Sequence, residues 1–413
     1  MTIPRPRPSP WVITVFLAVG GALNYADRSA FSAVLAPLRA DLKISDAVVG
    51  VLASLFLWSY SLSSTFAGLL ADRFSRTLLV AVSLVLWSTC MGLTGFAHGL
   101  TLLCFSRLGL GLGESPFHPA AFALVAEHHT PARRARAMSV LSVGFQGGIV
   151  VGGASAGFLA DHFGWRSGFW VLGGVGLLLA LVTPLFVADG IRTKAVASAP
   201  GQAAEALRYL GRTPSYLLIL SKQVLAEAST WIFIFWLPLY FFETFHLKLG
   251  EAGFAGTVAL SVFLVVGIAA GGWVSDALAR RGGQYRLVTL GATYLLAAPI
   301  LLVFLGRPHF AVVMTAVSAW SFLRGLGNSS ERPATSDVVP PAYRGTAFGL
   351  MNTFSTASGA VGVVLAGLLK QHFGLGAVFA GSSVLYLLTA ASLLYGAWRW
   401  MPRDIARAQA AKL

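Results

Sequence analysis

The first apolar segment of the chain contains an acid and a base side by side, in the sequence Asn24-Tyr25-Ala26-Asp27-Arg28. If this segment spans a membrane, each buried charge costs at least about 2.5–3.5 kcal/mol, so a functional role is the first hypothesis for both. Neighbouring residues of a helix point about 100° apart, so Asp27 and Arg28 cannot both face one partner. We expect one to face a cavity and the other a neighbouring helix. The alternative is that both lie at a hydrated helix end.

A second pair of charges, Arg107 and Glu114, lies in the fourth apolar segment. The two residues are seven positions apart, which is two helical turns, so they share one face of a helix. Pro116 and Pro119 follow and predict a bend, which is tolerated in a span that lines a cavity. A carboxyl group in such a place can exchange a proton, so Glu114 is the leading candidate for a proton site. The alternative is a fixed structural ion pair of Glu114 with Arg107 or Arg28.

The second half of the chain contributes further polar residues within apolar segments. Lys222 and Gln223 precede a group of aromatic residues, and their donors and acceptors suit hydrogen bonding to an organic solute. Arg324 and Asn328 lie one helical turn apart in the tenth segment. Polar and aromatic residues also occur in cores and at membrane interfaces, so these four are predicted as the lining of a site and nothing more.

The elements that must hold these residues are membrane helices. The sequence is 56% hydrophobic and 11% charged, whereas a soluble protein carries about 25% charged residues. Several runs match the roughly 20 apolar residues that a helix needs to cross a bilayer. They include Leu78–Ala97, Gly168–Val187, Leu287–Leu305 and Ala377–Tyr395. The composition therefore excludes a soluble globular protein and predicts a multi-pass protein of the lipid bilayer.

The net charge of +14 does not indicate a nucleic-acid partner, because the basic residues form small clusters between apolar runs. Most of the 30 Lys and Arg residues fall on the side of both termini, which the positive-inside rule makes cytoplasmic. The two cysteines, Cys90 and Cys104, lie in apolar runs. We therefore expect no disulfide framework, no metal site and no cofactor.

Apolar periodicity and Gly/Pro punctuation predict about twelve membrane helices. The expected spans are 11–38, 46–70, 77–97, 100–126, 137–159 and 167–188, then 215–243, 251–276, 286–305, 309–331, 345–369 and 375–399. The longest polar stretch separates the two sets. The prediction is an all-α membrane protein with an N-terminal six-helix bundle at 1–188, a cytoplasmic linker at 189–214, and a C-terminal six-helix bundle with a short tail at 215–413.

The two halves are predicted to be pseudo-symmetric repeats. Seven residues around the fifth span recur, each 210 positions later, around the eleventh span. The matched pairs are Pro131/Pro341, Arg134/Arg344, Ala137/Ala347, Gly157/Gly367, His162/His372, Phe163/Phe373 and Gly164/Gly374. Gapless agreement of this kind indicates internal duplication. The same spacing carries Glu114 onto Arg324, so corresponding positions are predicted to bear opposite charges, unless a gap shifts the pairing.

A charged loop follows the second span, in the sequence Gly68-Leu-Leu-Ala-Asp72-Arg73-Phe-Ser-Arg76. A related sequence lies at the same junction of the second half, with Asp276 in the place of Asp72. Asp72 can face a helix N-terminus, while Arg73 and Arg76 can meet lipid headgroups or carboxylates. We predict that these charges form a cytoplasmic gate latch between the halves. The alternative is that they only set the topology.

The predicted spans, the linker and this loop resemble the major facilitator superfamily of secondary transporters. Ser75 stands where that family usually has glycine, and Thr77 stands where a second basic residue often follows. The Gly-xxx-Gly-Pro pattern of drug/proton antiporters is absent, because Ala154 follows Gly153.

Two branches of the superfamily are similar to this chain. Asn24–Arg28, Gly113–Ala120 and Trp236–Tyr240 resemble the anion:cation symporters, whose bacterial members take up sugar acids and other carboxylates with protons. The Asp72–Arg76 loop and Leu86-Trp87-Ser88 look equally like the Spinster family of lysolipid and sphingolipid transporters.

The resemblance implies a transporter rather than an enzyme, working by alternating access of the two halves. For proton-coupled symport of a small organic anion, Arg28 would hold the anionic group. The binding residues would be Asn24, Tyr25, Arg28, Lys222, Gln223, Arg324 and Asn328. Asp27 and Glu114 would bind the protons, with Arg107 biasing the charge of Glu114. The protein would work as a monomer in the cell (inner) membrane.

The second hypothesis is a Spinster-like transporter of lysolipid, sphingolipid or another amphiphile, with a lateral opening and an apolar cavity. A sensor that resembles a transporter is a third, although no soluble signalling domain is attached. The sequence leaves open the solute, its direction, the number of protons, and the roles of Glu227 and Glu331.

Overall fold

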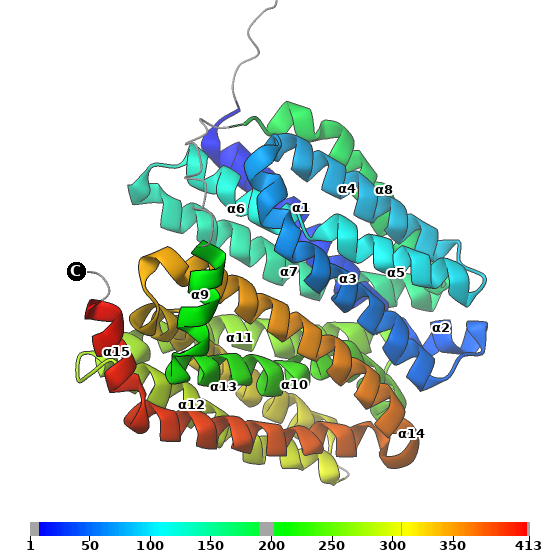
Figure 1. The fold of residues 1–413 in the computed structure, drawn as a ribbon. Coiled ribbons are helices and arrows are strands. Elements are labelled where there is room, and N and C mark those ends of the chain that lie inside the picture. The colour runs from blue at the N-terminus through cyan, green and yellow to red at the C-terminus, as the bar shows by residue number, and fades with distance from the viewer. Residues whose placement is uncertain (1–7, 190–201, 307, 411–413) are drawn as a thin grey trace, which may run out of the picture. The chain divides into compact units, whose positions relative to one another are not determined.

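The computed structural model describes residues 8–189, 202–306 and 308–410, without the side chains at 65–66, 68–73, 131–132, 135 and 202–203. Among the described residues every element is a helix. The chain divides into two compact units, seen in Figure 1. Unit 1 holds Met1–Val196 and Phe241–Thr257, and unit 2 holds Ala197–Tyr240 and Val258–Leu413. Each unit is described by itself.

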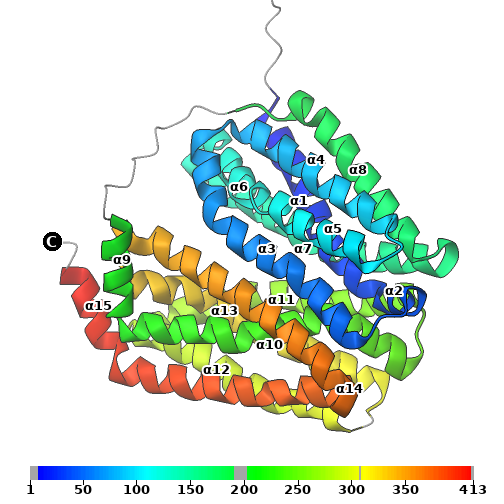
Figure 2. The ribbon, with the colours of Figure 1, turned by 45° about the vertical axis from the view of Figure 1, so that its right-hand side comes forward.

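The helices of unit 1 follow the first half of the sequence. They are α1 (Pro10–Ala33), α2 (Leu35–Leu42), α3 (Asp46–Arg73), α4 (Arg76–Gly95), α5 (Leu100–Glu114), α6 (Phe117–His128), α7 (Pro131–Phe163) and α8 (Trp165–Phe186). The Ser9 and Ser75 side chains accept hydrogen bonds from the first turns of α1 and α4, which fixes where these helices begin. In Figure 2, α4 runs beside α8 and α5.

Unit 2 contains the second half of the sequence. Its helices are α9 (Gln202–Gly211), α10 (Pro214–Phe245), α11 (Leu249–Ala279), α12 (Gln284–Ile300) with the short η1 (Leu301–Leu305), α13 (Phe310–Val338), η2 (Pro341–Tyr343), α14 (Arg344–Arg399) and α15 (Met401–Ala410). The last turns of α10 and the first turns of α11, residues 241–257, belong to unit 1.

Nine of the described helices are long and apolar enough to cross a membrane. All twelve predicted spans fall on helices, but they divide differently. α14 holds two predicted spans in one helix, and the predicted fourth span is broken into α5 and α6. The break lies at Ser115 and Pro116, because the prolines that follow Glu114 remove backbone donors. The structure thus bears out a multi-pass helical membrane protein.

The last glycine of the repeated sequence forms a sharp turn between two helical segments in each unit. Gly164 separates α7 from α8 with φ of 84°. Gly374 bends α14 between its two arms with φ of 76°, and the orange and red arms meet at this bend in Figure 2. A left-handed backbone is favourable for glycine and strained for other residues. The repeat seen in the sequence therefore encodes the same sharp turn twice.

Small residues let α1 pack closely against α7 within unit 1. A side chain added at Gly148 would meet the backbone of Ala22, and one at Gly152 would meet Ala26. Within each helix the two small residues are four positions apart, so they lie on the same face. This close approach fixes the position of α1, which carries Asp27 and Arg28.

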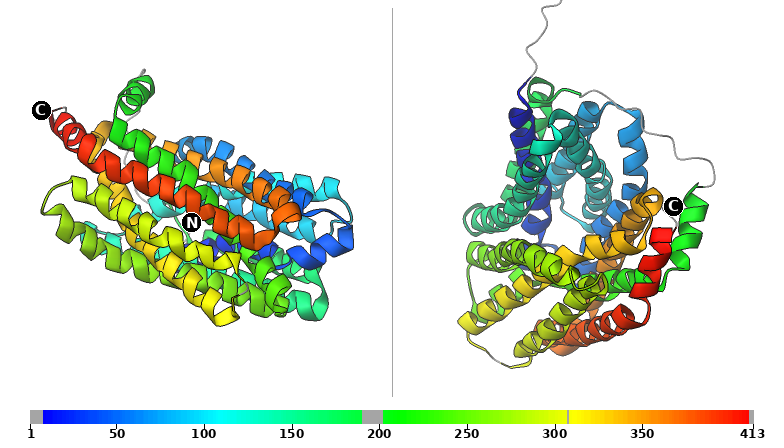
Figure 3. Two further views of the ribbon diagram at one scale, coloured as in Figure 1. Left: turned by 90° about the horizontal axis from the view of Figure 1, so that it is seen from below. Right: turned by 90° about the vertical axis from the view of Figure 1, so that its left-hand side faces the viewer.

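Two short helices in unit 2 were not predicted. α9 occupies part of the predicted linker, of which residues 190–201 lie outside the description, and α15 occupies the predicted tail. Figure 3 shows both helices, green and red, at the same end of unit 2. The Arg407 guanidinium of α15 stacks on Tyr209 of α9 and donates to the Arg212 carbonyl oxygen. Both helices are polar in composition, so the sequence carries no apolar run at these positions.

Candidate functional site

A buried ion pair joins the first helix of unit 1 to the fifth. The Arg28 Nη2 atom donates to Glu114 Oε2 at 2.8 Å, and Arg28 Nε donates to the same oxygen at 3.1 Å. The Arg28 side chain is 8% exposed and that of Glu114 is fully buried. Arg28 Nη2 also donates to Asn24 Oδ1, one turn earlier, at 3.3 Å. Of the two partners that the sequence left open for Glu114, Arg28 is the one that forms the pair.

Aromatic rings surround the Arg28 guanidinium. Its carbon lies 4.6 Å from the ring centre of Tyr25, 4.7 Å from that of Tyr60 and 5.1 Å from that of Phe56. Contacts of this kind stabilise a desolvated cation by about 2 kcal/mol or more each. Tyr25 was predicted as a binding residue. Tyr60 and Phe56 of α3 were missed, because an aromatic residue in a span carries no signal that separates it from core packing.

Asp27 and Arg107 lie close to the ion pair and carry polar atoms that have no hydrogen-bond partner in the described part of the chain. Both side chains are buried, and both carboxylate oxygens of Asp27 have no hydrogen-bond partner among the described residues. The same holds for Nε and Nη2 of Arg107, whose guanidinium stacks on the Phe31 ring at 3.5 Å. Asp27 feels the charges of Glu114, Arg107 and Arg28. Unit 1 therefore buries two acids and two bases in one neutral group with unused donors and acceptors.

A second buried cluster lies in unit 2, between α10 and α13. Lys222 Nζ donates to Glu227 Oε1 at 2.7 Å and to Glu331 Oε2 at 2.6 Å. Gln223 Nε2 donates to the other oxygen of Glu331 at 2.7 Å, and its own Oε1 accepts from Lys222 at 3.4 Å. Lys222 and Gln223 were predicted as binding residues, whereas the roles of Glu227 and Glu331 were left open by the sequence.

Arg324 lies on the same face of α13 as Glu331 and has unused donors. Its Nε and Nη1 atoms have no hydrogen-bond partner in the described part of the chain, and its guanidinium lies 5.1 Å from the Trp320 ring centre. Asn328 lies one turn further along α13, and its buried Oδ1 atom likewise has no hydrogen-bond partner among the described residues. The bounds of α5–α6 and of α13 keep the constant spacing of the repeat, so Arg324 does correspond in position to Glu114.

Of the four predicted gate residues, two make ion pairs within their own unit, and the side chains of the other two lie outside the description. Arg76 pairs with Glu127 of α6, inside unit 1. Asp276 lies 3.6 Å from Arg286 of α12, inside unit 2. The side chains of Asp72 and Arg73 lie outside the description. The latch between the halves thus stays a prediction, and Glu127 is the partner that sequence reasoning missed.

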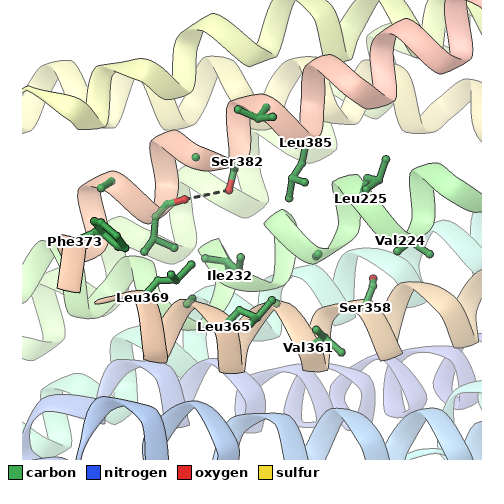
Figure 4. Close-up of a pocket in the computed structure, with 17 residues that line it drawn as sticks. Val224, Leu225, Ile232, Ser358, Val361, Leu365, Leu369, Phe373, Ser382 and Leu385 are labelled. Carbon is green, nitrogen blue, oxygen red and sulfur yellow. Dashed lines mark hydrogen bonds between the residues drawn. The ribbon is translucent and has the colours of Figure 1, made fainter. Parts of the chain in front are cut away.

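An apolar pocket of about 750 Å³ opens in unit 2 between α10 and the two arms of α14. Figure 4 shows Ile232 and Leu225 of α10 and Leu365 and Leu369 of the first arm pointing into it. Ser382, on the second arm, donates its hydroxyl to the Val378 carbonyl oxygen, so it offers no free donor to a ligand. The pocket suits a purely apolar group.

Long apolar helices that bury paired charges and unpartnered polar groups are the features of a membrane transport protein. Residues 17–363 match the Major Facilitator Superfamily, so the chain belongs to that superfamily. The resemblance inferred from the sequence is confirmed. The protein is a multi-pass membrane transporter and not an enzyme.

Curated relatives cover nearly the whole chain. An MFS-type efflux pump of Mycolicibacterium smegmatis is 28% identical over 95% of this chain and 92% of its own. The hexuronate transporter of Bacillus subtilis is 27% identical over 90% of each chain, and a chloroplastic ascorbate transporter of Arabidopsis thaliana is 26% identical over 92% of this chain and 73% of its own.

Solved structures confirm the fold. A bacterial homolog of the human lysosomal transporter Spinster, in an inward-facing and unoccupied conformation, matches with a TM-score of 0.84 over 97% of this chain and 99% of its own, at 19% identity. A D-xylose-proton symporter matches with a TM-score of 0.71 over 95% of this chain and 98% of its own, at 14% identity. Both likenesses show that this chain has the fold of these transporters.

Proposed function

We propose that this transporter carries a small organic anion, a sugar acid or another carboxylate, together with protons. The observation that carries the proposal is the Arg28–Glu114 pair of unit 1, buried beside Asp27 and Arg107, whose carboxylate oxygens and Nε and Nη2 atoms have no hydrogen-bond partner among the described residues. The hexuronate and ascorbate transporters among its relatives move solutes of this class. The chain would have twelve spans in two six-helix bundles, cytoplasmic termini, and a place in the inner membrane, and it would act as a monomer by alternating access.

The chemistry follows from charge balance. Asp27, Arg28, Arg107 and Glu114 sum to zero when all are ionised. An arriving carboxylate competes with Glu114 for the Arg28 guanidinium and adds one negative charge to this buried group. Uptake of one proton by Glu114 or Asp27 restores neutrality and releases Arg28 to the solute. Neither solute nor proton is favoured alone, and this mutual dependence is the thermodynamic basis of coupling.

The test uses purified protein in liposomes with D-glucuronate as the probe. Wild-type protein should accumulate D-glucuronate when the entry side is made acidic. Glu114→Gln should lose that accumulation and keep exchange of internal for external D-glucuronate. Glu205→Gln removes an exposed carboxylate of α9 by the same chemical change and should behave as wild type. Full proton-driven uptake by Glu114→Gln would remove Glu114 from the coupling role.

Arg28→Ala tests the binding role separately. The variant should lose D-glucuronate binding, because the carboxylate is proposed to take the place of Glu114 on the Arg28 guanidinium. Arg208→Ala, in exposed α9, is the matched control. Unchanged affinity in Arg28→Ala would move recognition of the anion elsewhere.

A second candidate function is transport of a lysolipid or another amphiphile. The apolar pocket of unit 2 favours it, because an alkyl chain fits such a lining and a sugar acid does not. Gly381 lines the pocket, and a side chain added there meets nothing within 4 Å. Gly381→Phe should therefore fill the pocket and block uptake of lysophosphatidylcholine. Gly174→Phe, on an equally open glycine of α8, should not. Absence of lysolipid uptake by the wild type would dismiss this candidate.

A further inference from the structure

The buried charges of unit 2 repeat the arrangement of unit 1. Arg107 and Glu114 are seven residues apart in α5, and Arg324 and Glu331 are seven residues apart in α13. Each glutamate pairs with a base on the first membrane helix of its own half: Glu114 with Arg28, and Glu331 with Lys222. Because Arg324 corresponds to Glu114 in the repeat, the set in unit 2 is displaced by two helical turns toward the C-terminal end of its helix.

The set in unit 2 is also neutral and also contains an unused arginine. Lys222 and Arg324 balance Glu227 and Glu331. The groups that face Glu227 come from every helix packed around it: Lys222 on α10, Arg324 and Glu331 on α13, Tyr294 on α12 and Tyr386 on α14. Among the residues that the structure describes, Arg324 Nε and Nη1 and the two tyrosine hydroxyls have no hydrogen-bond partner. These donors suit an anionic group.

The two glutamates differ in how they are held. Each oxygen of Glu331 accepts a hydrogen bond, one from Lys222 and one from Gln223. Glu227 accepts from Lys222 through Oε1 and lies within reach of the charge of Arg324. The side chains of Glu227 and Glu331 are 14% and 13% exposed, whereas that of Lys222 is 1% exposed, so the glutamates differ in their hydrogen bonds and not in their exposure. A proton can thus reach Glu227, and its arrival leaves the Lys222–Glu331 pair between α10 and α13 intact.

We propose that unit 2 holds a second site of proton coupling, in which Arg324 binds a second anionic group of the solute and Glu227 takes up a proton when it does. The inference rests on the proposed function. An anion on Arg324 cancels the charge that balances Glu227 and leaves one excess negative charge in the cluster. Protonation of the Glu227 carboxylate removes that excess. No covalent bond changes: the proton comes from water and returns to water when the anion leaves.

The test counts protons bound with the anion. Titration of purified full-length protein with D-glucarate, a sugar acid with two carboxylates, in buffers of different ionisation enthalpy, gives the number of protons taken up per anion by calorimetry. Glu227→Gln and Arg324→Gln should each take up about one proton fewer than the wild type. Glu227→Asp keeps a carboxylate and should keep the wild-type number, and Glu205→Gln is the surface control.

Two results would overturn the inference. One is an unchanged proton number in a folded Glu227→Gln variant that still binds the anion. The other is a proton loss in Glu227→Gln that Glu227→Asp shares, since that would indicate a structural role. If wild-type protein binds D-glucuronate but not D-glucarate, the inference fails and the proposed function stands. If it binds neither, the proposed solute class fails, and sulfate is then the probe for Arg324. Failure of sulfate to cause proton uptake in the wild type, or equal uptake in wild type and Glu227→Gln, rejects the site in unit 2.

Discussion

The Arg28–Glu114 pair gives a prediction whose size follows from its burial. Arg28→Met removes the cation and leaves the fully buried Glu114 carboxylate without its partner. Loss of one member of a buried pair costs about 3–5 kcal/mol, because the remaining charge stays out of water. Glu114→Gln should cost less, because the amide oxygen can still accept from Arg28 and the guanidinium keeps its contacts with Asn24 and Tyr25.

The double variant separates the pair from its surroundings. Arg28→Met with Glu114→Gln leaves no unpaired charge at this point, so its loss should be smaller than the sum of the two single losses. For residues in direct contact the difference reaches about 3 kcal/mol. The measurement is the free energy of reversible unfolding in mixed micelles, for the four proteins of the cycle. Acidic buffer neutralises the unpaired Glu114 carboxyl, so the loss in Arg28→Met should shrink there and be largest in alkaline buffer.

Additivity would refute the reasoning. If the double variant loses the sum of the single losses within about 0.5 kcal/mol, the 2.8 Å contact does not couple the two residues. A destabilisation in Arg28→Met that is equal in acidic and alkaline buffer would show that it comes from lost packing against the rings and not from an unpaired carboxylate.

Two further predictions concern stability. Gly148→Ala places a methyl group against the backbone of Ala22, at 2.6 Å from its Cα. The variant should lower the free energy of unfolding by about 1–3 kcal/mol in the same assay. The control is Gly147→Ala, whose methyl group meets nothing within 4 Å, so it should be neutral or stabilising by up to about 1 kcal/mol. Equal effects at the two glycines would contradict the close packing of α1 on α7. Asp404 accepts a hydrogen bond from the Ser215 N–H at 2.9 Å, at the start of α10, and its side chain is buried. Asp404→Ala removes this acceptor and should lower the free energy of unfolding by about 1–3 kcal/mol. Asp404→Asn keeps an acceptor oxygen, so an equal loss in that variant would argue against the role of this hydrogen bond.

The sequence was sufficient for the class of protein and for the charges of unit 1, and insufficient for how those charges pair. Asp27, Arg28, Arg107 and Glu114 stand out because a charge inside an apolar run is costly. Which arginine meets Glu114 depends on how far apart α1 and α5 lie and how each is rotated, and that is set by packing contacts such as Gly148 on Ala22.

Residues of unit 2 were harder to interpret. Lys222 and Glu331 are far apart in sequence and are joined only when α10 and α13 pack, so one sequence gives no sign of their contact. Tyr60 was missed for a related reason, because its ring contact with Arg28 is one of many that an aromatic residue in a span could make. Gly164 and Gly374 stood out in the sequence as a matched pair of the repeat. The structure gives the reason, because both have positive φ, which favours glycine over other residues.

Charge balance makes a final prediction about what Glu114→Gln gains. The variant changes the buried set of unit 1 from neutral to one excess positive charge, held by Asp27, Arg28 and Arg107. A carboxylate that binds this set restores neutrality without a proton, so the variant should carry the anion alone. Moving one charge through 100 mV is worth about 2.3 kcal/mol, which corresponds to an accumulation of about 50-fold.

This gain is measurable in the same liposomes. With no pH gradient and a potassium diffusion potential that is positive inside, Glu114→Gln should accumulate D-glucuronate and the exposed-site variant Glu205→Gln should resemble the wild type. With D-glucarate, a sugar acid that carries two carboxylates, the proton inferred for unit 2 reduces the charge that Glu114→Gln moves from two to one, and adding Glu227→Gln should increase the response to the potential. A Glu114→Gln variant that ignores the potential would show that neutrality of the buried set does not govern coupling.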